Sequence, residues 1–139
     1  MAAFDEVDLK ILEILEKNSR ITWKEIGSLV HMTGQAVAAR IDKLEELGIL
    51  EGYTVKINRK LLGSPIIALV TVFMKTTNHA SFHNFIHSQK EIIEAFRISG
   101  EGCYSLKIMV PTQADLVELL DRILSFGNYK VKLSIEKIK

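Results

Sequence analysis

The stretch TWKEIGSLVHMTGQAVAARIDKLEELG, residues 22–48, contains the start and stop signals of two helices. Thr22 and Glu25 stand at the spacing of a capping box, in which each side chain binds the other residue's backbone N–H. Thr33 is placed to cap a second helix, and Gly48 suits the left-handed conformation that often ends one. Two short helices joined by a tight turn predict a helix-turn-helix.

A further helix is expected before this pair, over residues 5–17. Its apolar residues fall on one face at helical spacing: Val7, Ile11, Ile14 and Leu15. Leu9 and Leu12 lie off that face, so the helix is expected to pack on two sides, either within the domain or against a second subunit. After the pair, Tyr53, Val55 and Ile57 alternate with polar residues, which predicts a strand that serves as a wing or a linker.

The second half of the chain has the pattern of a mixed module. Strands are expected over residues 66–74, 92–98, 104–110 and 131–135, and helices over residues 80–89 and 112–124. The order βαββαβ predicts a ferredoxin-like unit whose helices cover one face of the sheet, and a second copy is expected to cover the other. The fold class is therefore α+β, with a winged-helix-like helix-turn-helix domain at 1–52, a strand or linker at 53–64 and the βαββαβ domain at 65–139.

Composition excludes several classes of protein but does not indicate DNA. The 139 residues are 47% apolar and carry 18 Lys+Arg against 17 Asp+Glu, a net charge of +1, so wholesale disorder is excluded. No apolar run reaches the roughly 18 residues of a membrane span, so no membrane partner is expected. Cys103 is the single cysteine, which fits a reducing compartment, and we expect a cytoplasmic location. Residues 1–60 carry nine basic and ten acidic side chains, which gives no basic patch by count alone.

Several short motifs recur in a familiar order. They are Asp5–Asp8 with Ile11 and Leu12, Ser19–Thr22, Arg40-Ile41 with Leu44-Glu45, Gly48–Leu50, Gly52–Thr54, Ile98–Gly100 and the strand that begins at Tyr104. With these motifs the whole chain resembles the Lrp/AsnC (feast/famine) family of bacterial and archaeal transcription regulators. The resemblance implies that double-stranded DNA is a partner, that homodimers form through the βαββαβ domain and often assemble into octamers, and that operator DNA is bound and bent. It also implies an amino-acid effector in many members.

The third helix presents a small and weakly polar outer face for DNA. The side-chain amide of Gln35 could pair with adenine; the alternative is that Gln35 is simply a solvated residue of the helix. Arg40 matches the family's arginine, which favours a phosphate or base contact; an ion pair with Asp42 or Glu45 is the alternative. The predicted DNA-binding residues are Thr22, Trp23, Lys24, Thr33, Gln35, Ala36, Ala39, Arg40 and Lys43. Those at helix starts suit phosphates, although Trp23 also suits packing. So few polar groups predict modest sequence specificity and a reliance on DNA shape and flexibility.

A glycine-rich turn is the predicted effector site. In the family this turn lies near a subunit interface; here it comprises Gly100, Glu101, Gly102, Cys103, Tyr104 and Ser105. Amino-acid-responsive members often carry an aromatic residue in place of Gly102 and an acidic one in place of Cys103. Glu101 is then the one remaining acceptor for an α-ammonium group, and a purely structural turn is the alternative.

Other chemistries find little support. There is no nucleophile with a base, no carboxylate pair, no phosphate-binding loop and no cofactor motif, so neither catalytic residues nor a cofactor are predicted. His79, His83 and His87 recur every four residues, but a solvated polar face is favoured over a metal site. Cys103 is interpreted as a small buried hydrophobe rather than a redox sensor. Two alternatives are weighed. The first is a sensing or assembly module without DNA binding. The second is an enzyme similar to sirohaem decarboxylases; such an enzyme would need a cluster of arginine and histidine residues, and only Arg97 and the three histidines of the predicted helix are evident here.

Overall fold

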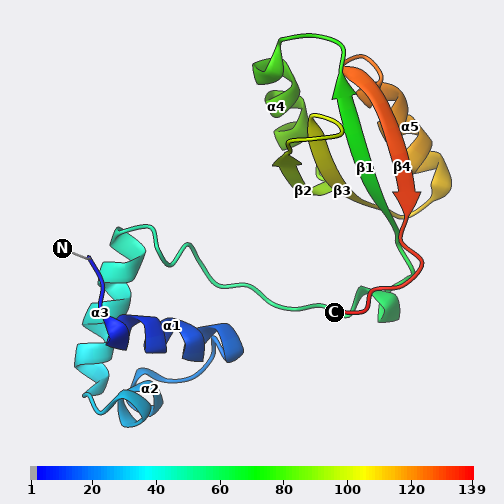
Figure 1. Cartoon of the computed structure of the whole chain (residues 1–139). Helices are drawn as coiled ribbons and strands as arrows, with labels where there is room; N and C mark the ends of the chain where they lie inside the picture. Colours follow the sequence, from blue (N-terminus) through cyan, green and yellow to red (C-terminus); the bar gives the residue numbers. More distant parts are fainter. Residues whose placement is uncertain (1–2) are drawn as a thin grey trace. The chain divides into compact units, whose positions relative to one another are not determined.

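The computed structural model describes residues 3–139, which form two compact units. The first ends at Ile57 and the second begins at Asn58, inside the segment that the sequence predicts as a linker. Figure 1 shows the three helices of the first unit and the helix-covered sheet of the second. Within residues 3–139, no helix is long and apolar enough to cross a membrane.

The first unit is the predicted helix-turn-helix preceded by one helix. Its helices are α1 (Glu6–Lys17), α2 (Trp23–Val30) and α3 (Gly34–Glu46). The capping box forms as predicted, since Thr22 Oγ1 accepts from the Glu25 N–H at 3.1 Å and the Glu25 carboxylate accepts from the Thr22 N–H at 2.9 Å. This exchange lowers the pKa of Glu25, with the backbone bond from Thr22 as the largest cause.

The three helices meet around a small core and one very close turn. Ile11, Ile26, Val37 and Ile41 are almost fully buried between them. A Cβ added to Gly27 would lie 2.4 Å from the Met32 carbonyl oxygen, so only glycine fits there. The Met32 N–H donates to the Gly27 carbonyl at 2.9 Å, which closes the turn between α2 and α3.

The strand predicted around Tyr53–Ile57 is wrong for the isolated chain. Residues 51–58 have no regular secondary structure, and a single 3₁₀ turn, η1 (Arg59–Leu61), follows. The alternation leaves Tyr53, Val55 and Ile57 between 49% and 75% exposed. A strand needs a neighbour for its backbone N–H and C=O groups, and this segment is paired with none among the described residues.

The second unit is the predicted βαββαβ module. Its elements are β1 (Ile66–Met74), α4 (His79–Ser88), β2 (Ile92–Arg97), β3 (Tyr104–Val110), α5 (Gln113–Ile123) and β4 (Gly127–Leu133). The strands lie in the order β2-β3-β1-β4 and every neighbouring pair is antiparallel. The last strand begins four residues earlier than predicted, because Gly127 fits closely against the backbone of Phe73 and pairs with Met74.

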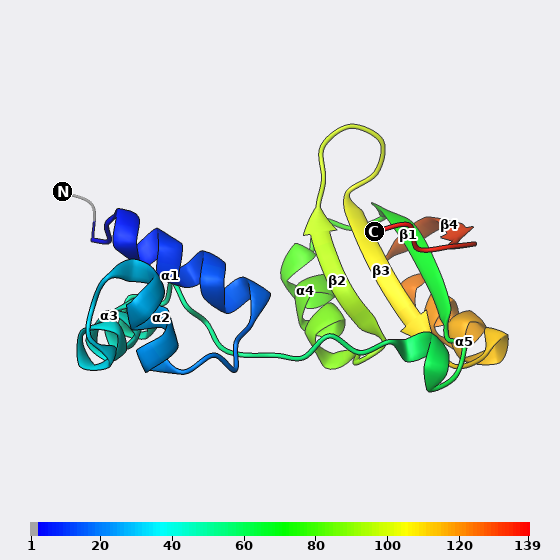
Figure 2. The same cartoon turned by 90° about the horizontal axis from the view of Figure 1, so that it is seen from below.

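The two helices cover one face of this sheet and leave the other open (Figures 1 and 2). Val70, Val72, Leu106 and Ile108 point to the helices and are at most 1% exposed. The opposite face carries the alternate residues of each strand. Leu69 and Phe96 on it are 47% and 61% exposed.

Candidate nucleic-acid interface and ligand module

The N-termini of α2 and α3 lie side by side. A Cβ added to Gly34 would be 3.3 Å from the backbone nitrogen of Lys24, so the first turns of the two helices are in direct contact. Thr22 and Thr33 cap these helices, and both residues are exposed, as is Lys24. Two adjacent helix starts offer unpaired N–H groups and the positive ends of two dipoles to the same patch of an anionic partner.

The outer face of α3 is small and accessible. Gln35, Ala39 and Lys43 are exposed and Ala36 is half-buried, whereas Val37 on the opposite side is fully buried. Lys43 takes part in no ion pair with the residues of the described chain. Trp23 is 39% exposed, so part of its side chain packs against the protein and part is accessible to solvent. The predicted residues other than Arg40 are therefore exposed or half-buried at the starts of α2 and α3 and along α3.

Arg40 has partners that the sequence did not indicate. Its Nη1 lies 2.7 Å from Asp5 Oδ1 and 2.9 Å from Asp8 Oδ1, both at the start of α1, and not against Asp42 or Glu45. The Asp8 side chain is 3% exposed, so its carboxylate depends on this guanidinium for charge compensation. The hydrogen bond from Arg40 is the first cause that lowers the pKa of Asp5 to about 2. Asp5 and Asp8 also cap the first turn of α1 through a capping box of their own, so Arg40 links α3 to the start of α1.

The glycine-rich turn between β2 and β3 does not gather its six predicted residues at one point. Figure 2 shows it as a loop that extends beyond the two strands. Gly100 and Gly102 have φ of 88° and 95°, and a Cβ at Gly102 would lie 2.4 Å from Thr71 Cγ2. A side chain at position 102 would therefore meet the methyl group of Thr71 and would have to adopt an unfavourable positive φ. Glu101 Oε1 accepts from Lys130 Nζ at 2.7 Å, and this contact lowers the pKa of Glu101.

The last three residues of the turn diverge. The Cys103 side chain packs half-buried against the core of the module, and its N–H donates to the Val72 carbonyl at 2.8 Å. Tyr104 is 2% exposed on the helix side of the sheet, whereas Ser105 belongs to the open side. The alternation of β3 places these two neighbours on opposite faces, which the sequence prediction of a single effector site did not take into account.

The histidines of α4 do not form a simple solvated face as expected. His79 Nδ1 and His83 Nε2 both lie within hydrogen-bond distance of the Tyr104 hydroxyl, at 2.7 and 2.8 Å. Arg97 Nη2 is 3.5 Å from His79 Nε2, and its guanidinium carbon lies 5.9 Å from the centre of the Tyr104 ring. The buried phenol needs a partner, and the four-residue spacing of α4 brings two imidazoles to it. That spacing was visible in the sequence, but the partner was not.

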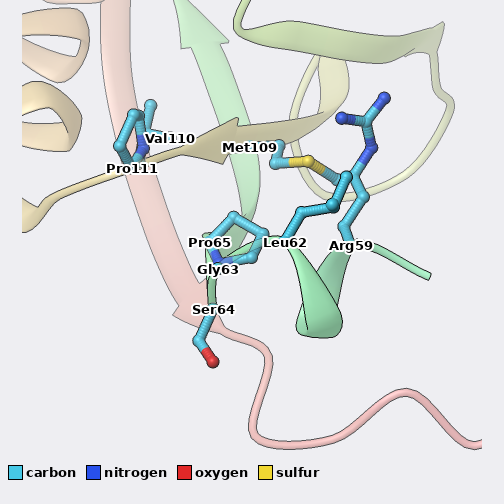
Figure 3. Close-up of a pocket in the computed structure, with 8 residues that line it drawn as sticks. All are labelled: Arg59, Leu62, Gly63, Ser64, Pro65, Met109, Val110 and Pro111. Atoms are coloured by element: carbon cyan, nitrogen blue, oxygen red, sulfur yellow. The ribbon is translucent and has the colours of Figure 1, made fainter. Parts of the chain in front are cut away.

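A separate cavity of about 360 Å³ lies at the other end of β3 (Figure 3). It is formed by residues of η1, the segment that leads into β1, and the end of β3: Arg59, Leu62, Gly63, Ser64, Pro65, Met109, Val110 and Pro111. Arg59 is its one charged lining residue. Because β3 spans seven residues, roughly 20 Å separates this cavity from the glycine-rich turn. Across residues 3–139, no three His, Cys, Asp or Glu side chains are grouped to hold a metal ion.

Fold and interface together define a class: a two-part DNA-binding regulator with a helix-turn-helix unit and a separate βαββαβ module. Residues 4–45 match the model of the AsnC-type helix-turn-helix domain, and residues 67–139 match the Lrp/AsnC ligand binding domain. The chain belongs to the Lrp/AsnC family of DNA-binding transcriptional regulators, which is a family of regulators and not of enzymes.

Relatives with known names match it along almost their whole length. The transcriptional regulator LrpB of Bacillus subtilis is 44% identical over 97% of this chain and 91% of its own length. LrpA of the same organism is 37% identical over 96% of this chain and 98% of its own length. The solved structure of B. subtilis LrpC superposes with a TM-score of 0.89 at 27% identity and covers 100% of this chain and 99% of LrpC.

Proposed function

We propose that the paired N-termini of α2 and α3 hold the phosphates of double-stranded DNA while α3 enters the major groove. The observation that carries this proposal is the direct contact between the start of α3 at Gly34 and the backbone of Lys24. The small outer face of α3 allows a close approach, and Gln35 is its one exposed amide beside that start. Binding is then tolerant of sequence and depends on how easily the site bends.

In this proposal Arg40 acts on DNA only indirectly. Its guanidinium is held by two carboxylates at the start of α1, so Lys24 and Lys43 are the predicted DNA-binding cations that take part in no ion pair with the described residues. The role of Arg40 is to fix α1 against α3 and thereby the angle at which α3 is presented. This differs from the direct phosphate or base contact that the family resemblance implies.

The experiment is a fluorescence-anisotropy titration of labelled DNA from the region upstream of the protein's own gene, at several salt concentrations. Lys24→Ala should weaken binding to all sequences alike and reduce the slope of log K against log salt by about 1 per contacting subunit. Gln35→Ala should weaken binding and flatten the preference between sites. Lys10→Ala, on the exposed side of α1, is the matched control and should leave both quantities unchanged. An unaltered salt slope in Lys24→Ala would contradict the proposed interface.

We further propose that the open face of the sheet is the homodimer interface. No helix of the described residues covers this face, and it exposes apolar side chains such as Leu69 and Phe96 on two strands of the sheet, which is typical of an association surface. Leu69→Asp should reduce the solution mass measured by light scattering to that of one chain, whereas Val117→Asp, equally exposed on α5, should not. Assembly beyond the dimer, up to an octamer, is expected to provide the affinity that one weak interface lacks.

An amino-acid effector at residues 100–105 is a conditional part of the proposal. Glu101 would have to exchange Lys130 for the α-ammonium group of the ligand, since it is the acidic side chain of that turn. Calorimetry against the common amino acids, with Glu101→Gln as the control, tests this. No heat with any of them in the wild-type protein would leave the turn a structural element.

A further inference from the structure

We propose that the cleft between α4 and β2 binds a small carboxylate that has no amino group, with Arg97 and His83 as the donors. The site goes beyond the proposed DNA interface and does not depend on it. It also lies on the helix side of the sheet, and Tyr104 belongs to it through its side chain rather than through the turn that precedes it.

When both imidazoles are neutral, the donors and acceptors of Arg97, His79, Tyr104 and His83 can be assigned in only one way. Arg97 has no acceptor, so it donates to His79 Nε2, and His79 must then carry its hydrogen on Nδ1. That N–H donates to the Tyr104 oxygen, and the Tyr104 hydroxyl donates to His83 Nε2. His83 consequently carries its hydrogen on Nδ1. This chain of hydrogen bonds therefore ends at the His83 Nδ1–H, for which none of the described side chains is an acceptor.

The cleft between α4 and β2 is lined by side chains that can bind an anion. It has a volume of about 210 Å³, with His83, His87 and Arg97 on its walls and Ile86 and Ala95 among its apolar residues. Arg97 forms no ion pair with any residue of the described chain. A planar guanidinium without a carboxylate partner, in a cleft that the His83 imidazole also lines, matches the two oxygens of a carboxylate.

The same lining indicates which carboxylates fit. No Asp or Glu lines the cleft, so an α-ammonium group would enter without a counter-charge beside Arg97. An α-amino acid is therefore disfavoured and a 2-oxo acid or a simple aliphatic acid is favoured. Ile86 and Ala95 offer an apolar surface to a short branched chain.

The test is isothermal titration calorimetry on the full chain with three probes. They are 3-methyl-2-oxobutanoate, valine, which has the same carbon skeleton with an amino group, and inorganic phosphate. Because the glycine-rich turn is itself proposed to take an amino acid through Glu101, the titrations are made in the Glu101→Gln background, and Glu101 does not line the cleft. We expect saturable heat with the oxo acid and none with the other two. Arg97→Gln should weaken the oxo acid at least about tenfold, while Arg122→Gln, an exposed arginine on α5, should not change it.

A second variant keeps the outcome clear if Arg97→Gln disturbs the edge strand. His83→Ala changes an exposed residue and should also weaken the oxo acid, and circular dichroism confirms that each variant is folded. The proposal is overturned if the folded protein takes up no oxo acid, or if Arg97→Gln and His83→Ala bind it as the wild type does. Valine or phosphate binding as tightly as the oxo acid would likewise overturn it.

Discussion

Replacing Gly27 with alanine tests whether the helix-turn-helix depends on one close backbone contact. The new Cβ would lie 2.4 Å from the Met32 carbonyl oxygen, whereas such carbon–oxygen contacts are normally about 3.3 Å or longer. Met32 has little freedom to move, because its N–H donates to Gly27 and it leads directly into Thr33, the cap of α3. Alanine would otherwise favour the helix by about 1 kcal/mol. A clash of this size costs about 3 kcal/mol, so we expect a net destabilisation of roughly 2 kcal/mol.

For a unit of this size, that loss lowers the melting temperature by about 10 °C. Thermal unfolding followed by circular dichroism measures it, and hydrogen exchange locates the loosened amides in α2 and α3. Gly52→Ala is the matched control, because no atom lies within 4 Å of its added Cβ and it should stay within about 0.5 kcal/mol of wild type. DNA affinity should fall only in Gly27→Ala, since the paired helix starts separate. Equal stability of the two variants would refute the steric reasoning.

Three further changes address other contacts. Arg40→Met leaves the buried Asp8 carboxylate unpaired and should lower the free energy of unfolding by about 2 kcal/mol, and adding Asp8→Asn should restore part of it in a urea titration. The pKa of Asp5 is lowered from 3.8 to about 2, so the Asp5 carboxylate contributes fully to stability above pH 3.8 and loses that contribution as the pH falls towards about 2. The melting temperature should therefore fall less across this pH range in Asp5→Asn than in the wild type. Gly102→Ala should destabilise the module by about 2 kcal/mol in the same titration, and adding Thr71→Ser should recover the steric part only, because the positive φ remains.

Features set by neighbours in sequence were predictable. Thr22, Glu25 and Thr33 act within one helical turn, so their capping bonds follow from spacing alone. The strand Tyr104–Val110 was predicted with its observed ends, because it follows a glycine-rich hairpin turn directly. In the structure its residues alternate between buried and half-buried.

Features set by distant partners were not predictable. Arg40 and Asp5 are 35 positions apart, and nothing local to α3 indicates that α1 supplies the counter-charges. His79 and Tyr104 are 25 positions apart, so the helical pattern could place the histidines on a polar face but could not show the phenol they bind. The segment at Tyr53 failed for a third reason. It has the period of a strand but no neighbouring strand among residues 3–139.

The ion pairs of Arg40 and Lys130 also show how the near-neutral net charge of the chain is distributed. Arg40 is compensated by Asp5 and Asp8, and Lys130 by Glu101, so part of the positive charge is used inside each unit. In the proposed interface, the positive potential offered to DNA is local: it comes from the dipoles of two adjacent helix starts, with Lys24 and Lys43 beside them. Such a surface contacts phosphates at short range but produces little long-range attraction. With the assembly that we propose, affinity comes from several copies acting on one DNA, and the open sheet face is then as necessary for regulation as α3 itself.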